Sequence, residues 1–130
     1  MFPIESAGRP YAARLCDQDV RYDRKAGGTS LAEDARAFAG VWIGEWSNRI
    51  CTALIVESVT SNTYANIVHV IGVGLGIGGT RYRASAEISG RTLSWGPSTA
   101  RYEFTLQDQA TLSGSRTTGF GVERATLARH

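Results

Sequence analysis

Hydrophobic and polar residues alternate along most of the chain after its first third. The alternation is clearest over 80–88, where Tyr82 and Ile88 fall on one face and Arg83 and Glu87 on the other. A period of two is typical of a strand with one buried face and one solvated face. The pattern predicts strands over 40–47, 50–59, 63–72, 80–88, 91–96, 100–107, 110–116 and 120–129.

The predicted strands are separated by short segments rich in glycine, serine and asparagine, which are typical of turns. Closing such strands into a barrel buries their apolar faces and also removes exposed sheet edges. We therefore expect an all-β fold, an eight-stranded antiparallel up-and-down barrel, with a two-sheet sandwich as the alternative. The segments 50–59 and 63–72 are apolar on both faces, so an N-terminal arm, a helix or another subunit should cover them outside.

The residues before the barrel divide into a polar stretch and a short helix. Residues 1–29 are polar and irregular, which predicts either a disordered arm or a strap on the barrel. Such a strap has four apolar anchors: Tyr11, Leu15, Val20 and Tyr22. Ser30 and Glu33 form a capping box for one or two helical turns that end at Gly40. We accordingly expect an arm over 1–29 and a barrel domain over 30–130.

Composition excludes several classes of partner. The chain has 130 residues and a formal net charge of +2, and its arginines are spread among acidic residues, so we expect no nucleic-acid partner. No apolar run approaches the roughly 20 residues of a membrane span. The first residues lack a signal-peptide pattern, which predicts a cytoplasmic location. Cys16 and Cys51 would pair only in an oxidising compartment, so we expect both to be reduced.

The motif Gly40-x-Trp42, placed after a short helix, resembles the opening of the lipocalins and their calycin relatives. The resemblance implies that Trp42 plugs one barrel end and that an arginine of the last strand packs across its ring. Arg124 is the first choice for this arginine and Arg129 the second. A guanidinium stacks well on an indole, which makes the pairing physically reasonable.

The longer form Gly40-x-Trp42-x-Gly44 is similar to the haem-binding nitrobindin-like barrels. Those barrels have a third glycine where this chain has Trp46, and they bind iron through a late histidine. His69 lies mid-chain and His130 is the last residue, so we expect no haem. The cysteines and histidines also lack metal-ligand spacing, and we expect no metal and no cofactor.

Fatty-acid-binding relatives of the lipocalins hold a carboxylate with arginine and tyrosine inside the barrel, which directs attention to Arg116. It shares strand parity with Leu112 and points inward if the strand reaches it. If the strand ends earlier, Arg116 lies in solvent at the rim. A buried arginine needs a counter-charge, which a ligand carboxylate would supply. The candidate wall and anchor residues are Trp46, Tyr82, Trp95, Tyr102, Phe104 and Arg116.

Catalytic candidates are few. His69 is the only internal histidine, and acid–base chemistry would require a carboxylate beside it, such as Glu45 or Glu57. A packed structural role for His69 is the alternative. The loop 72–79 contains a formal G-x-G-x-x-G, but a strand follows it where a dinucleotide site needs a helix. We interpret this loop as a lid or an interface loop.

Three functions fit these observations. The leading hypothesis is a barrel that binds a small, mostly apolar molecule and is gated by the loop 72–79. The first alternative is a cofactor-independent cyclase or isomerase acting on a hydrophobic polyene or polyketide-like chain, since that chemistry needs shape more than nucleophiles. The second is a filled barrel that serves as an interaction or oligomerisation module, for example in a homodimer.

Overall fold

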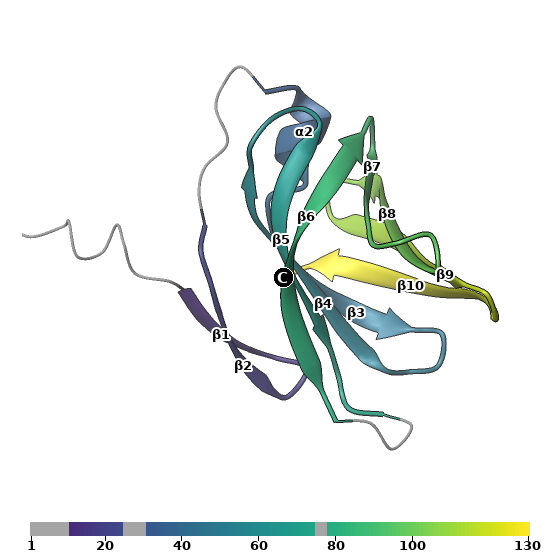
Figure 1. Cartoon of the computed structure of the whole chain (residues 1–130). Coiled ribbons are helices and arrows are strands. Elements are labelled where there is room, and N and C mark those ends of the chain that lie inside the picture. The colour runs from purple at the N-terminus through teal and green to yellow at the C-terminus, as the bar shows by residue number, and fades with distance from the viewer. Residues whose placement is uncertain (1–10, 25–30, 75–77) are drawn as a thin grey trace, which may run out of the picture.

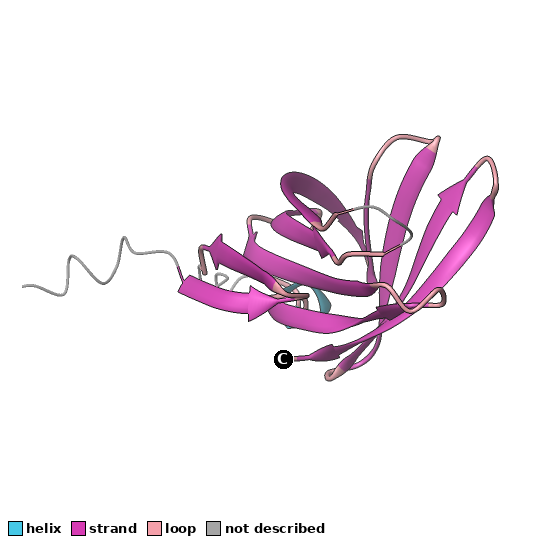
Figure 2. Cartoon of the chain, turned by 90° about the horizontal axis from the view of Figure 1, so that it is seen from below, coloured by secondary structure: helices cyan, strands magenta, loops and turns pink. Residues whose placement is uncertain are grey.

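Eight antiparallel strands form a closed barrel in the order β10-β3-β4-β5-β6-β7-β8-β9 (Figures 1 and 2). The structure is a computed structural model that describes residues 11–24, 31–74 and 78–130. Closure confirms the barrel over the sandwich, and every predicted strand lies within two residues of an observed one. The strands are β3 (Gly40–Trp46), β4 (Cys51–Val59), β5 (Tyr64–Ile71), β6 (Thr80–Ser89), β7 (Thr92–Trp95), β8 (Ala100–Asp108), β9 (Thr111–Thr118) and β10 (Gly121–Arg129).

One end of the barrel is closed by the helix α2 (Glu33–Ala37) and by Trp42. The indole nitrogen of Trp42 donates to the Phe38 carbonyl at 2.9 Å, and both side chains are fully buried. The Arg129 guanidinium lies 4.1 Å from the centre of the Trp42 ring and donates to the carbonyls of Ala37 and Ala39. These contacts fix the helix to the last strand.

The arginine on Trp42 is therefore Arg129, and the first choice, Arg124, is wrong. The reason is strand parity. Arg129 shares the inward parity of Leu127 and is the register partner of Trp42, whereas Arg124 lies on the outer face beside Ser115. A one-residue difference in parity moves a side chain to the opposite face of a sheet.

The start of α2 also differs from the sequence prediction. The helix begins at Glu33 with Ala32 as its N-cap, and no side-chain capping bond is formed within the helix. The Ala32 amide instead donates to the Asn62 side-chain oxygen at 2.8 Å. Ser30, the serine of the proposed capping box, lies outside the described residues. A tertiary contact thus takes over the local capping role.

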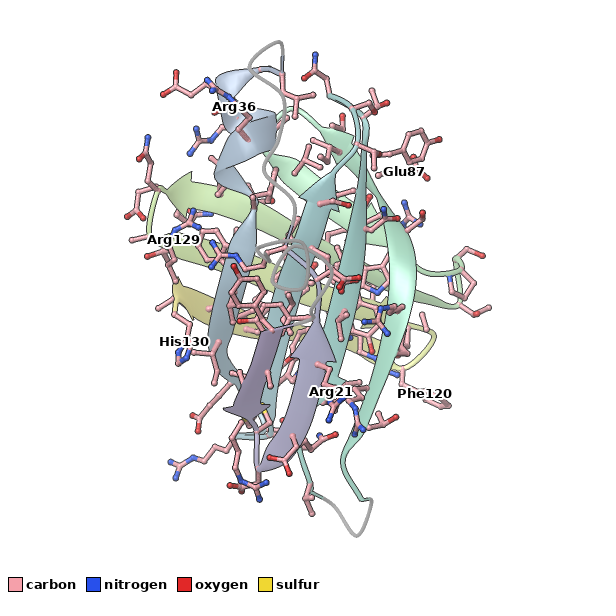
Figure 3. The ribbon with its side chains drawn as sticks, turned by 90° about the vertical axis from the view of Figure 1, so that its left-hand side faces the viewer. Arg21, Arg36, Glu87, Phe120, Arg129 and His130 are labelled. Carbon is pink, nitrogen blue, oxygen red and sulfur yellow. A yellow bond between two sulfur atoms is a disulfide. The ribbon has the colours of Figure 1, made fainter. Side chains whose placement is uncertain are left out.

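The polar N-terminal segment contains a β-hairpin, where an irregular arm or strap was expected. Strands β1 (Tyr11–Leu15) and β2 (Gln18–Tyr22) pair antiparallel and lie against the outside of the barrel (Figures 1 and 3). Leu15, Val20 and Tyr22 are buried, as anchors should be, whereas Tyr11 is 52% exposed. They pack on outward-facing residues of β3, β4 and β5: Val41, Ala53, Ile55, Val68 and Val70. The hairpin is therefore the cover for the doubly apolar strands.

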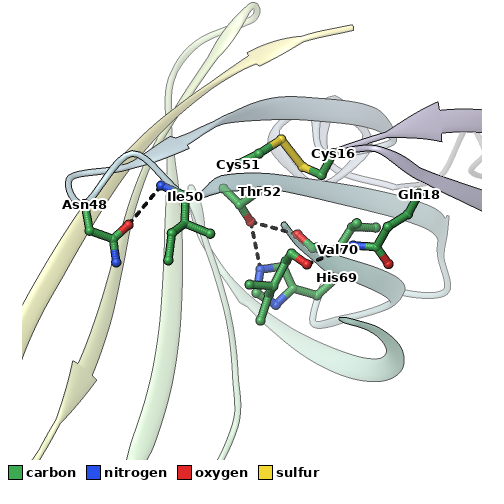
Figure 4. The surroundings of a disulfide bond; sticks show 9 residues. Cys16, Gln18, Asn48, Ile50, Cys51, Thr52, His69 and Val70 are labelled. Atoms are coloured by element: carbon green, nitrogen blue, oxygen red, sulfur yellow. Dashed lines mark hydrogen bonds between the residues drawn. A yellow bond between two sulfur atoms is a disulfide. The ribbon is translucent and has the colours of Figure 1, made fainter. Parts of the chain in front are cut away.

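A disulfide joins the tip of this hairpin to the barrel (Figure 4). Cys16 and Cys51 are bonded with a Cα–Cα distance of 5.5 Å, so the expectation of two reduced cysteines is wrong. The hairpin turn places Cys16 over the first residue of β4, at a separation that suits a disulfide. Disulfides are typical of oxidising compartments.

Within the described ranges no helix is long and apolar enough to span a membrane. The cytoplasmic location stays a prediction.

Candidate binding site at the barrel mouth

The end of the barrel opposite α2 is formed by the turns 47–50, 96–99 and 119–120 and by the described loop residues 72–74 and 78–79, and we call it the mouth. A cavity of 260 Å³ opens there. Its lining combines apolar and aromatic side chains with glycine backbone and a few polar groups. The lining residues are Trp46, Asn48, Ile50, Ile71, Gly72, Gly74, Gly78, Thr80, Tyr102, Arg116 and Glu123.

Below the mouth the barrel is filled by stacked aromatic side chains. Trp95 stacks on Tyr102 with ring centres 5.2 Å apart, and on Phe104 with ring centres 5.5 Å apart. Trp46 packs against Tyr102 and Phe104 at 6.0 Å from each. Of the predicted wall residues, Trp46 and Tyr102 line the cavity, while Trp95 and Phe104 form part of the core beneath it. The cavity at the mouth therefore lies above this aromatic layer.

Arg116 lies at the mouth and points into it. Strand β9 continues to Thr118, so the proposal that the strand ends before Arg116 is wrong. The Arg116 Nε donates to the Tyr102 hydroxyl at 3.1 Å, and Nη1 contacts a Glu123 carboxylate oxygen at 3.4 Å. Glu123 therefore provides the counter-charge that was expected from a ligand carboxylate.

Glu123 is a site residue that the sequence analysis missed. It is the cross-strand partner of Arg116, and its second carboxylate oxygen accepts from the Asn48 side chain at 2.7 Å. Asn48 is held in turn because its own side-chain oxygen accepts from the Ile50 amide (Figure 4). The sequence alone could have identified Glu123 as inward-facing, since it shares the strand parity of the inward-facing Leu127 along β10.

His69 is fully buried in the layer below the mouth, bonded through both ring nitrogens. Its Nε2 lies 3.0 Å from the Thr52 hydroxyl (Figure 4). Its Nδ1 lies 2.9 Å from the Tyr82 hydroxyl. The Thr52 hydroxyl donates to the Val70 carbonyl, and the Trp95 indole nitrogen donates to the Tyr82 oxygen. Tyr82 therefore belongs to this series of buried hydrogen bonds and is not among the residues that line the cavity.

One end of this series of hydrogen bonds fixes the tautomer of the neutral ring. The Val70 carbonyl can only accept, so the Thr52 hydroxyl uses its one proton there and accepts from Nε2 of His69. In neutral His69 the proton is therefore on Nε2, and Nδ1 accepts from the Tyr82 hydroxyl. Burial, followed by the positive charge of Arg116, lowers the pKa of His69 to about 3. Burial is also the main reason that the pKa of Tyr82 rises to about 12.

Among the residues that the structure describes, His69 is hydrogen-bonded to Thr52 and Tyr82 and to no carboxylate, so the acid–base pair considered above is not formed there. Glu45 is exposed on the outer face of β3, where its register partners are Cys51 and Thr126. Glu57 is also on the outside, at a bulge in β4, where it accepts from the Asp23 amide and pairs with Arg83. The structure thus separates both catalytic candidates, His69 and Glu45, by the wall of the barrel.

The glycine-rich loop 72–79 joins β5 to β6 at the mouth, and residues 75–77 lie outside the described residues. Three of its glycines line the cavity. Both ends of the loop meet the hairpin: the Gln18 side chain donates to the Ile71 carbonyl at 2.8 Å and leaves no room for a Cβ at Gly79. The Gly72 amide donates to the carbonyl of the disulfide-bonded Cys51.

Comparison with solved structures supports the fold. A redesigned beta barrel matches with a TM-score of 0.59 and 15% identity over 78% of this chain and 99% of that chain. A de novo designed fluorescence-activating beta barrel matches with a TM-score of 0.55 and 16% identity over 77% of this chain and 100% of that chain. No protein-family model matches the sequence, and no curated protein matches it. At these identities the similarity establishes the barrel fold alone.

Proposed function

We propose that the barrel binds a small, mostly apolar molecule in the cavity at its mouth. The observation that carries this proposal is the cavity itself, which is open to solvent between apolar side chains and two charged ones. Ligand sites of this kind are concave and mainly apolar, with a few polar groups that fix orientation. The resemblance to lipocalins also supports the proposal, since it implies a barrel that is closed at the Trp42 end and open at the other.

The size of the cavity limits the ligand. Its 260 Å³ lies below the roughly 300–1,000 Å³ of pockets for drug-sized molecules. It equals the volume of about nine water molecules, and therefore of a ligand with about ten non-hydrogen atoms. One or two fused rings fit this space, in contact with Trp46 and Tyr102. A long acyl or polyene chain would require the aromatic layer below to move.

The test is a titration of the isotope-labelled protein with 2-naphthol, followed by amide and indole resonances. We expect saturable shifts at the Trp46 indole N–H and at Gly72 and Gly74. The Trp42 indole N–H at the closed end should not move, since it is buried and bonded to a carbonyl. Shifts spread evenly over both ends, or no shifts at the mouth, would overturn the proposal.

Two glycine variants provide a matched control. A Cβ at Gly78, which lines the cavity, meets nothing within 4 Å, and the same holds for Gly119 in the turn between β9 and β10. Neither has a left-handed φ, so a side chain is tolerated at both. Gly78→Leu should fill the cavity and abolish the 2-naphthol shifts, whereas Gly119→Leu should retain them with an unchanged affinity.

A further inference from the structure

The charged part of the cavity lining is an ion pair that a neighbouring side chain holds on each side. Arg116 on β9 and Glu123 on β10 are direct cross-strand partners that both face the cavity. Tyr102 accepts from Arg116 on one side, and Asn48 donates to Glu123 on the other. The side chains remain 36% and 38% exposed, so a ligand in the cavity can reach both. The pair is a preorganised recognition element.

Both members of this pair retain unused hydrogen-bonding capacity. A guanidinium has five N–H groups, of which Tyr102 and Glu123 occupy two within the described part of the chain. A carboxylate has about four acceptor sites, of which Arg116 and Asn48 occupy two. A strong donor and a strong acceptor therefore stand side by side at the edge of an aromatic cavity.

The charges of Arg116 and Glu123 cancel, which bears on the charge of the ligand. An anion drawn to Arg116 would also meet the Glu123 carboxylate, and a cation drawn to Glu123 would meet the guanidinium. For a charged ligand, the attraction to one residue would thus be offset by the repulsion from the other. A neutral ligand with an acceptor next to a donor engages both residues at once.

We infer that the mouth selects an uncharged, planar ring compound whose carbonyl is adjacent to a ring N–H, that is, a cyclic amide. The carbonyl accepts from Arg116, the N–H donates to Glu123, and the ring contacts the edges of Trp46 and Tyr102 that line the cavity. This inference rests on the proposed function, because it assigns a ligand class to the same cavity. It replaces the carboxylate ligand that Arg116 alone would favour.

Three bicyclic probes test the inference, of which the first two are equal in size and the third is slightly larger. 2-Quinolone carries the carbonyl and the N–H, coumarin has an oxygen in place of that N–H, and 2-naphthoate is an anion. We expect 2-quinolone to bind most tightly by the same resonance titration. Coumarin should bind about tenfold more weakly, because it leaves the Glu123 carboxylate without a donor. 2-Naphthoate should also bind more weakly than 2-quinolone.

A charge-removing variant sharpens the test. Glu123→Gln leaves Arg116 without its counter-charge, so the affinity for 2-naphthoate should rise about tenfold while that for 2-quinolone falls. Glu103→Gln makes the same change in charge on the exposed outer face of β8 and should alter neither affinity. Far-UV spectra and unfolding midpoints confirm that both variants are folded before affinities are compared.

The outcomes separate the two proposals. If none of the three probes shifts the mouth resonances, the proposed function itself fails. If the probes bind at the mouth but coumarin equals 2-quinolone, or 2-naphthoate exceeds it, the barrel binds ligands and the cyclic-amide inference is wrong. If Glu103→Gln changes the affinities as much as Glu123→Gln does, the discrimination comes from overall charge and the inference is equally wrong.

Discussion

The disulfide between the hairpin and the barrel should contribute a large share of the stability of this protein. The perturbation is the double variant Cys16→Ser/Cys51→Ser. The bond joins residues separated by 35 positions, and the chain-entropy relation for a loop of this length gives about 4 kcal/mol. With the average unfolding entropy per residue and 130 residues, the melting temperature should fall by about 15 °C.

The native state adds a local reason for this effect. Cys16 and Asp17 form the two-residue turn of the hairpin with φ values of 52° and 61°. These left-handed conformations are unfavourable for residues other than glycine, asparagine and aspartate. Without the bond to Cys51, the turn can relax, and the Gln18 contact with the loop 72–79 weakens. Amide exchange should therefore accelerate first at Gly72, whose N–H bonds to Cys51.

Urea unfolding, followed by tryptophan fluorescence and far-UV dichroism, measures the free energy directly. Free energies extrapolated to water are compared, because removing a crosslink also raises the denaturant slope by exposing more surface in the unfolded chain. Dithiothreitol should destabilise the natural protein by the same amount and leave the double variant unchanged. A loss below about 1 kcal/mol, well under the usual disulfide contribution, would refute the reasoning.

Three further perturbations probe the interior and the closed end. Tyr82→Phe removes the hydroxyl that bonds to His69 Nδ1 and to the Trp95 indole N–H, so both groups stay buried without a partner. Urea unfolding should show that the free energy of unfolding falls by about 2 kcal/mol. The low pKa of His69 means that the unfolded chain binds more protons between pH 6.5 and about 3. The contribution of neutral His69 to the free energy of unfolding is therefore fully present above pH 6.5. Below pH 6.5 it falls by up to about 1.4 kcal/mol per pH unit. The His69 ring-carbon shift should stay constant from pH 8 to 5 while added imidazole titrates. Arg129→Ala should lower the free energy of unfolding by about 2 kcal/mol, and Arg124→Ala should change it little.

The barrel could be predicted from sequence because its strands follow a local rule. A strand with one buried face alternates, and its parity assigns each side chain to a face without knowledge of the partner strand. The same rule placed Tyr102 on the interior, and it placed Arg116 there on the condition that the strand reached it, which β9 does. It would have chosen Arg129 over Arg124, and it would have found Glu123, had parity been applied to the whole of β10.

The hairpin and its disulfide depend on information that is not local. Gln18–Tyr22 does alternate, but it is short and rich in charged residues, and its turn at Cys16 lacks the glycine that usually marks a two-residue hairpin turn. Whether Cys16 meets Cys51 depends on where the hairpin docks. That is decided by the apolar outer faces of β4 and β5, for which the sequence offered an N-terminal arm, a helix or another subunit as the cover without deciding among them.

The hydrogen-bond chain through His69 limits the chemistry that the barrel interior can perform. A general base must offer a free lone pair to substrate, but the Nδ1 of His69 accepts from Tyr82 and its Nε2 carries the proton bonded to Thr52. Freeing either nitrogen would leave a buried donor or acceptor unpaired, at a cost of about 1–3 kcal/mol. The interior polar groups thus stabilise one neutral, directional arrangement beneath the cavity. Under the proposed function, ligand recognition falls to the groups above it, where Arg116 and Glu123 remain partly exposed.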